Sequence, residues 1–186
     1  MPELPEVETI KSRLSEVVIG QIIQSIEVLR SKSFQGDQTA VVGATITAVE
    51  RRAKVLSLEL SSGYSLLVHL KMTGQIIVVA DQVRIGGGHP TADWVRDLPS
   101  AHTRVIIRFQ DPCMTLFFND QRVFGWLKVV DQDQKKLELS QYGPDINSPT
   151  LTAETFWLGL QRSRLPLKVR LMNRSFVAGF GNIYAC

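Results

Sequence analysis

Cysteine, membrane-length apolar segments and a secretory leader are the features that this sequence most clearly lacks. Its two cysteines, Cys113 and Cys186, are too few and too far apart for a disulfide framework or a four-ligand zinc site. No apolar run approaches the roughly 18 residues that cross a bilayer, and the acidic N-terminus has no apolar core of a secretory signal. We therefore expect a cytoplasmic protein with no membrane partner and no metal site in this chain.

Acidic residues are missing from the end of the chain. Between Thr155 and Cys186 there are five bases and no acid; because the net charge of the whole chain is +3, the first 154 residues carry −2. A second basic group is the run Arg51-Arg52-Ala53-Lys54. Clusters of this kind are often only solvated surface, but a segregated basic end favours a nucleic-acid partner. An acidic protein bound by a β-sandwich interaction module is another reading of the same charges.

The first element predicted is a helix. Its apolar residues recur at helical spacing, namely Val7, Ile10, Leu14, Val17 and Val18. Pro5 suits the first turn of a helix and Gly20 suits its end. The length of 186 residues allows one domain, or one domain and part of a second.

Short apolar runs then follow one another without helices between them. They are QIIQSIEVL, TITAVE, KVLSLEL, SLLVHL, QIIVVA, TRVIIRF, MTLFF and FGWLKVV. Closely spaced strands bounded by turn residues predict an antiparallel β-sandwich over residues 1–130. The stretch 82–101 contains GGGHP and interrupts this rhythm, so we expect a long loop there.

The rest of the chain predicts a second, helical unit. Residues 131–150 are polar and are expected to be a linker, and residues 151–186 are expected to form an incomplete helical domain. Thr152 can cap a first helix and a second can follow Pro166. The fold class expected is therefore α+β: an N-terminal helix on an antiparallel β-sandwich, followed by the start of a helical domain that stops as a helix opens at Asn182.

The opening stretch MPELPEVE has a possible chemical use. Methionine is removed when a small residue follows, and the new N-terminus of Pro2 would be a secondary amine. An α-amino group has a pKa near 8, so a fraction of it is nucleophilic at neutral pH. It could attack C1′ of a nucleoside and form an iminium, with Glu3 and Glu6 as nearby acids. The alternative is that these residues only start a helix and suit its dipole.

Five stretches that lie in order along the chain resemble the formamidopyrimidine-DNA glycosylase / endonuclease VIII family, and its formamidopyrimidine branch in particular. They are MPELPEVE, ERRAK, HLKMTG, DQRVFG and VAGFGNIYA, and together they span almost the whole sequence. The resemblance implies an antiparallel sandwich followed by a helix–two-turns–helix domain. It also implies a base-excision-repair enzyme for double-stranded DNA that excises oxidised purines such as 8-oxoguanine and formamidopyrimidines, with abasic-site lyase activity.

The resemblance implies four catalytic residues. Pro2 would be the nucleophile that forms a Schiff base, Glu3 the main acid and Glu6 a supporting carboxylate. Lys54 would donate a proton in β-elimination and contact a phosphate. Without the resemblance, Lys54 is equally well an exposed strand lysine.

Three further residues match the family's wedge, which fills the space that a flipped base leaves. They are Met72, Arg122 and Phe124, and an apolar wedge with a stacking ring suits this task. The family usually reads DPRRFG where this chain has Gln121 and Val123, which leaves the geometry of that turn open. Local sequence alone favours core packing for Met72 and Phe124 and a surface charge for Arg122.

Other residues match positions where the family contacts DNA. His69 and His102 are two of these, although an isolated histidine is more often structural. Arg164 lies in a basic run where Ser163 could align equally well. Asn182 would hold a phosphate at a helix N-terminus, beside glycines that permit close approach.

Some family features have no counterpart in this sequence. These are the C-terminal zinc finger with its structural zinc, the loop that covers 8-oxoguanine and the arginine linked to δ-elimination. We therefore expect no cofactor in this chain, weak binding to DNA and a monomeric state. The alternative function is a catalytically inactive DNA-binding fragment of such an enzyme.

Overall fold

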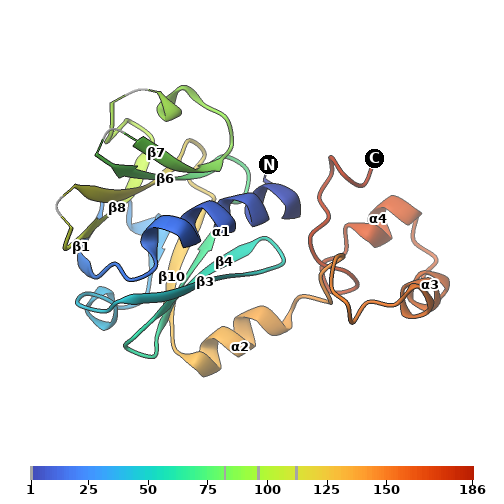
Figure 1. Ribbon diagram of the computed structural model, residues 1–186. Helices are drawn as coiled ribbons and strands as arrows, with labels where there is room; N and C mark the ends of the chain where they lie inside the picture. Colours follow the sequence, from blue (N-terminus) through green and yellow to red (C-terminus); the bar gives the residue numbers. More distant parts are fainter. Residues whose placement is uncertain (1, 82, 96, 112) are drawn as a thin grey trace.

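Two five-stranded sheets make up most of the chain before residue 131 (Figure 1). The structure is a computed structural model that describes residues 2–81, 83–95, 97–111 and 113–186. The first sheet has the strand order β1 (Ile23–Val28), β8 (Thr103–Phe109), β9 (Met114–Asp120), β6 (Gly74–Ala80) and β7 (Val83–Gly88). The second has the order β2 (Phe34–Gln35), β10 (Trp126–Val130), β5 (Ser65–His69), β4 (Val55–Leu60) and β3 (Ile46–Arg52). Neighbours are antiparallel except β2 and β10, so the expected sandwich is confirmed.

The strand β5 shows why its apolar run is buried on both sides. Because side chains alternate along a strand, Leu66 and Val68 enter the main core between the sheets. Leu67 faces the other way and joins a second cluster with Val55 and Val130. The partly buried side chains of Trp126, Leu139 and Tyr142 cover this second cluster. Burial on both faces explains a continuous apolar run in place of simple alternation.

The N-terminal helix α1 (Leu4–Val18) closes one side of the sandwich. It lies against the edge strands β7 and β3, one from each sheet (Figure 1). Its predicted apolar stripe is buried in the main core, through Val7, Ile10, Leu14 and Val18. The helix begins at the expected turn and ends before Gly20, whose φ of 87° suits only glycine well.

The prediction of a loop over residues 82–101 is wrong for its first part; residues 82 and 96 lie outside the described chain. Val83–Gly88 forms β7, which pairs with β6. Gly86 has a φ of 128°, and a Cβ there would lie 2.2 Å from the carbonyl oxygen of Ile76. The glycines that suggested a loop are needed because this edge strand runs so close to its neighbour. The chain then forms a loop that contains the short 3-10 helix η3 (Ala92–Trp94).

The segment 131–150, expected to be a linker, contains the helix α2 (Gln132–Ser140). Asp131 caps it: its carboxylate accepts from the N–H of Gln134, whose side chain accepts from the N–H of Asp131. A polar helix is invisible to a search for apolar periodicity, which is why the sequence suggested a linker. Two more short 3-10 helices, η1 (Ser31–Ser33) and η2 (Gln38–Ala40), flank β2.

The predicted helices after residue 150 are present as α3 (Ala153–Gln161) and α4 (Leu167–Leu171). Thr152 caps α3 by accepting the N–H of Thr155 at 3.1 Å. After α4 the chain runs back towards the N-terminus (Figure 1). At Asn182 it forms a single turn, in which the N–H of Ala185 donates to the carbonyl of Gly181 at 3.2 Å. Within the described residues, no helix has both the length and the apolar character to cross a membrane.

Replacing Gly86 with alanine tests the close pairing of β6 and β7. We expect Gly86→Ala to lower the free energy of unfolding by about 3 kcal/mol, because it adds a clash to an unfavourable φ. Gly43 is the control: its φ is 83° and a Cβ there meets nothing within 4 Å. Gly43→Ala should cost about 1 kcal/mol in the same denaturant titration. Equal losses in both variants would contradict the close approach of β7.

Candidate active site and DNA-binding surface

The side chain of Glu3 joins the two ends of the chain. It is fully buried, and its carboxylate accepts hydrogen bonds from the backbone N–H groups of Gly181 at 2.7 Å and Ile183 at 2.8 Å. The N–H of Leu4 donates to the carbonyl of Gly179 at 3.2 Å. Amide donors compensate for the cost of removing a carboxylate from water. The segment 179–184 therefore fixes the position of the N-terminus.

The glycines of VAGFGNIYA serve this contact. A Cβ on Gly181 would lie 2.3 Å from a carboxylate oxygen of Glu3, and one on Gly179, at φ 109°, would lie 2.4 Å from Cδ1 of Leu4. We had expected these glycines to admit a phosphate. In the structure the group that approaches them closely is the N-terminus.

Glu6 completes the carboxylate pair. Its carboxylate accepts from the N–H of Glu3 at 2.8 Å and from the hydroxyl of Tyr184 at 2.8 Å. Partial burial would raise the pKa of Glu6, but these hydrogen bonds outweigh burial and lower it. Pro2 is buried directly before this pair. Met1, whose removal the nucleophile hypothesis requires, lies outside the described residues.

Lys54 lies in the tight turn between β3 and β4, near both glutamates. Burial lowers the pKa of Lys54, against the opposite pull of the carboxylates of Glu3 and Glu6, and the charge of Lys71 lowers it further. A lysine with a lowered pKa gives up and takes back a proton more readily at neutral pH. The structure thus brings together Pro2, Glu3, Glu6 and Lys54.

A buried ion pair fixes this turn to the C-terminal part of the chain. Asp145 accepts from the guanidinium of Arg51 at 2.7 Å and from the N–H of Ala53 at 2.8 Å. Arg51 also donates to Glu8 of α1 at 2.6 Å. Two residues of the ERRAK motif are therefore structural, and they hold Lys54 against the active site.

A cationic cleft of about 250 Å³ lies beside Lys54. It has no acidic lining residue among Ala53, Lys54, His69, Lys71, Tyr142, Met172, Arg174, Gly179, Phe180 and Gly181. Burial lowers the pKa of Lys71, and the charge of Arg174 lowers it further. Cations held this close favour an anionic ligand. Lys71 and Arg174 were not among the expected site residues, although Lys71 lies inside the HLKMTG motif and Arg174 lies shortly before VAGFGNIYA.

His69 lines this cleft as a neutral imidazole. Its Nδ1 accepts the N–H of Lys71 at 3.0 Å, so the proton of the neutral ring lies on Nε2. Burial, with the charges of Lys71 and Lys54, lowers the pKa of His69 to about 3. The ring can therefore donate a hydrogen bond from Nε2 without carrying a charge.

The three predicted wedge residues lie together at adjacent loop tips. The guanidinium of Arg122 donates to Sδ of Met72 at 3.2 Å and lies 4.9 Å from the ring centroid of Phe124. Met72 is 41% exposed and Phe124 is 47% exposed. Core packing, the alternative for these two residues, is thus wrong.

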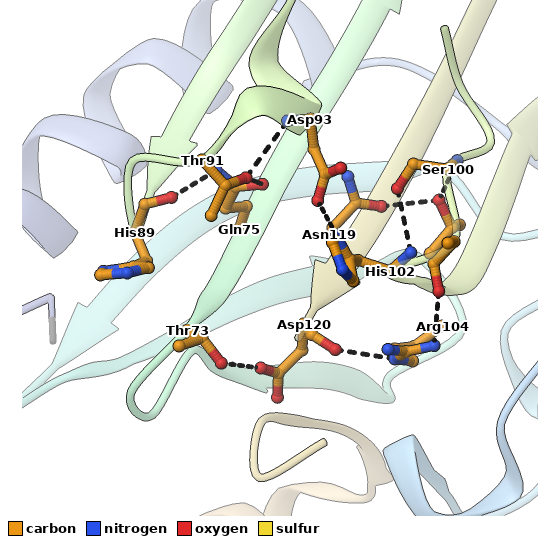
Figure 2. A network of polar contacts seen from close by, with 12 residues as sticks. Thr73, Gln75, His89, Thr91, Asp93, Ser100, His102, Arg104, Asn119 and Asp120 are labelled. Atoms are coloured by element: carbon orange, nitrogen blue, oxygen red, sulfur yellow. Dashed lines mark hydrogen bonds and ion pairs between the residues drawn. The ribbon is translucent and has the colours of Figure 1, made fainter. Parts of the chain in front are cut away.

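Asp120 organises the turn that carries two wedge residues. Its buried carboxylate accepts from the N–H groups of Arg122 at 3.1 Å and Phe124 at 2.8 Å. It also accepts from the hydroxyl of Thr73, beside Met72 (Figure 2). The turn forces the branched residue Val123 to a φ of 56°, which costs backbone strain. The first residue of DQRVFG is therefore the anchor of the wedge, a role that the sequence analysis did not assign.

The three remaining candidate DNA contacts, His102, Asn182 and Arg164, lie at different places relative to the wedge and the cleft. His102 lies at the start of β8, and its carbonyl accepts the N–H of Asp120 at 2.9 Å. Asn182 is exposed in the segment that holds Glu3. Arg164 is exposed between α3 and α4, and within the described residues no hydrogen bond links it to the other candidates.

The described residues do not fit a metal centre. Among them, no three histidine, cysteine, aspartate or glutamate side chains lie close enough together to hold an ion. Both cysteines are free and exposed. The structural zinc that the family implies therefore has no ligands in this part of the chain.

Acid titration should expose the buried neutral state of His69. An unfolded histidine has a pKa near 6.5, so between pH 6.5 and about 3 the unfolded chain binds a proton that the native chain does not. The contribution of neutral His69 to the free energy of unfolding is complete above pH 6.5. It decreases as the pH falls, and about 2 kcal/mol of it is lost at pH 5. His69→Asn should remove this part of the slope in denaturant titrations, whereas His89→Asn should keep it. An unchanged slope in His69→Asn would contradict the assignment.

Comparison with known proteins agrees with this geometry. The chain is 35% identical over 192 residues to a formamidopyrimidine-DNA glycosylase of Pelotomaculum thermopropionicum, covering 100% of this chain and 64% of the relative. It is 36% identical over 193 residues to that of Azorhizobium caulinodans, with 99% and 64% coverage. The chain therefore spans less than two thirds of the length of these relatives.

Solved structures give the same result. A Lactococcus lactis Fpg in complex with abasic-site DNA superimposes with a TM-score of 0.82 at 27% identity, over 99% of this chain and 64% of that one. The family model described as the formamidopyrimidine-DNA glycosylase N-terminal domain matches residues 1–127, more than half of the sequence. This chain thus belongs to the formamidopyrimidine-DNA glycosylase family.

Proposed function

We propose that this chain is the catalytic part of a bifunctional DNA glycosylase and abasic-site lyase that excises oxidised purines from duplex DNA. The observation that supports this most strongly is the clamp of residues 179–184 on Glu3, which holds Pro2 and Glu6 beside Lys54. A clamp of this kind fixes an N-terminus in place, and a nucleophile needs such positioning. The substrates proposed are 8-oxoguanine and formamidopyrimidines.

The proposed reaction begins at the N-terminal amine of processed Pro2. Its nitrogen bonds to C1′ of the damaged nucleoside, and the bond between C1′ and the base breaks as the base leaves with a proton from water. The bond between C1′ and the ring oxygen O4′ then breaks, the proton of the amine passes to O4′, and an iminium is left. Glu3 is proposed to take the proton of the amine and to donate it to O4′ as the ring opens, and Glu6 assists. The iminium then loses a proton from C2′ and the C3′–O bond breaks. Lys54, with its lowered pKa, is proposed to exchange protons in this elimination.

The wedge and the cleft suit the proposed substrate. A base must leave the stack before its C1′ can be attacked, and Met72, Arg122 and Phe124 form an exposed group that can fill the space. Lys71, Arg174 and His69 line a cleft without acids beside Lys54, which suits a backbone phosphate. Similar structures of L. lactis Fpg are complexes with DNA that contains an abasic site or N7-benzyl-Fapy-dG.

A second candidate is a protein that binds DNA without turnover. It is favoured by one observation, that the exposed wedge and the cationic cleft can contact DNA whether or not the N-terminal amine reacts. Loss of binding strength alone would leave the amine chemistry of the N-terminus in place, so the two candidates can be separated.

Trapping with borohydride tests the nucleophile. The chain without Met1 is mixed with duplex DNA that carries 8-oxoguanine or an abasic site opposite cytosine. Its N-terminus is first verified by mass spectrometry. We expect a reduced covalent adduct that maps to Pro2. Pro2→Gly should lower the yield at least about tenfold, because the secondary amine is lost. Pro5→Gly is the control, since it changes the first turn of α1 and keeps the amine.

Each result of this experiment has a distinct meaning. An adduct with the abasic site alone would restrict the proposal to the lyase. No adduct from a folded chain that binds DNA would favour the second candidate. An adduct that maps elsewhere, or full activity in Pro2→Gly, would contradict the nucleophile assignment.

The wedge can be tested apart from the amine chemistry. Phe124→Ala should lower adduct formation with 8-oxoguanine duplex about tenfold or more, because stacking on the opened duplex is lost. It should spare an abasic site in single-stranded DNA, where nothing has to be unstacked. Tyr64→Ala, which removes an exposed ring at another place, is the control. Equal losses on both substrates would indicate a general defect and not a wedge.

A further inference from the structure

A buried carboxylate lies behind His102. Asp93 is 2% exposed, and its Oδ2 lies 2.8 Å from Nδ1 of His102, whose side chain is one-third exposed (Figure 2). Asp93 belongs to η3, in the loop between β7 and β8. The imidazole therefore has one nitrogen held against a buried acid and keeps part of its surface open to solvent.

The backbone around Asp93 is tied down at several points. The N–H of Asp93 donates to the hydroxyl of Thr91, which in turn donates to Gln75 of β6 (Figure 2). The guanidinium of Arg84, on β7, donates to the carbonyls of Asp93 at 3.1 Å and Trp94 at 2.8 Å. These contacts fix the carboxylate relative to the sheet, and with it the imidazole of His102.

Asp93 determines which ring nitrogen of His102 carries the proton. An ionised carboxylate can only accept a hydrogen bond, so Nδ1 of His102 must be the donor. In a neutral imidazole whose proton is on Nδ1, Nε2 carries no proton and cannot donate a hydrogen bond to a phosphate. His102 can do so only when both nitrogens are protonated. His69 has the opposite tautomer. Its Nδ1 accepts a hydrogen bond from the N–H of Lys71, so its Nε2 carries the proton.

Three charged side chains of the described residues surround His102. Asp93 holds Nδ1, and Asp97 lines the same cavity of about 470 Å³ as His102. Arg104, on β8, points its guanidinium at the carbonyls of Ala101 and Asp120. Because Asp120 in turn anchors the wedge turn, two successive hydrogen bonds connect His102 to Phe124 of the wedge.

We propose that Asp93 is a positioning residue that makes His102 a proton-coupled phosphate contact at the edge of the wedge. On binding, Nε2 of His102 takes up a proton from solvent and keeps it while it donates a hydrogen bond to a DNA phosphate; on release the proton returns to solvent. His69 makes its contact without proton uptake. The phosphate part of this inference rests on the proposed DNA-binding function, whereas the tautomer does not.

The tautomer is tested first, on the full chain without DNA. Long-range ¹H–¹⁵N NMR spectra distinguish the ring nitrogens. We expect the proton of neutral His102 on Nδ1 and that of His69 on Nε2. Asp93→Asn should remove the preference at His102 and leave His69 unchanged. A neutral His102 with its proton on Nε2 would overturn the inference, whatever the chain does with DNA.

Calorimetry then tests the phosphate contact. Binding of a duplex with a tetrahydrofuran abasic-site analogue is measured at pH 7.5 in buffers of different ionisation enthalpy, which gives the number of protons taken up. We expect His102→Gln and Asp93→Asn to lower this number and to weaken binding about three- to tenfold. His69→Asn should weaken binding and keep the proton uptake.

The outcomes separate the two proposals. Equal proton uptake in the original chain and in His102→Gln would overturn the coupled contact while the DNA-binding function stands. A chain with the expected tautomers that does not bind the duplex would reject the proposed function and the phosphate contact together. Unaltered affinity in Asp93→Asn with an altered tautomer would overturn the positioning role of Asp93 in binding.

Discussion

The carboxylate of Glu3 is the group on which the rest of the site depends. Burying an ionised acid is costly unless several donors surround it, and here those donors are backbone amides from a segment 178 residues or more away in sequence. This requirement brings Gly179 and Gly181 against α1 and places Tyr184 on Glu6. One buried charge therefore determines where the chain's first residues lie.

A buried acid that accepts hydrogen bonds also holds three other elements that face the proposed DNA. Asp120 holds the wedge turn, Asp145 fixes the turn of Lys54, and Asp93 fixes His102. Each of these acids is buried and accepts at least one hydrogen bond. Because these acids accept hydrogen bonds from groups elsewhere in the protein, none of them lines the cleft. The cations of the cleft can therefore bind an external anion. The arrangement separates charges that hold the protein from charges that can hold a ligand.

The tight turns show what this positioning costs. Ala53, Lys71 and Val123 have φ values of 56°, 51° and 56°, a region that residues with a side chain seldom adopt. All three lie at the turns that carry Lys54 or the wedge. Strain at such positions persists only where surrounding contacts determine the backbone. The buried pair of Arg51 with Asp145 and the hydrogen bonds of Asp120 supply such contacts.

The sequence by itself determined the helix 4–18, every described strand except β2 and β7, and the helices after residue 150. These depend on local patterns of apolar residues, caps and turns. Motifs that lie in order also pointed to Pro2, Glu3, Lys54 and the wedge residues, whose catalytic and DNA-binding roles are proposals. Tertiary structure alone decided that Gly86–Gly88 belong to a strand, that Asp120 and Asp93 are anchors, and that His69 and His102 carry their protons on opposite nitrogens. Those properties arise from contacts between distant segments, because burial and hydrogen-bond partners cannot be read from the neighbours along the chain.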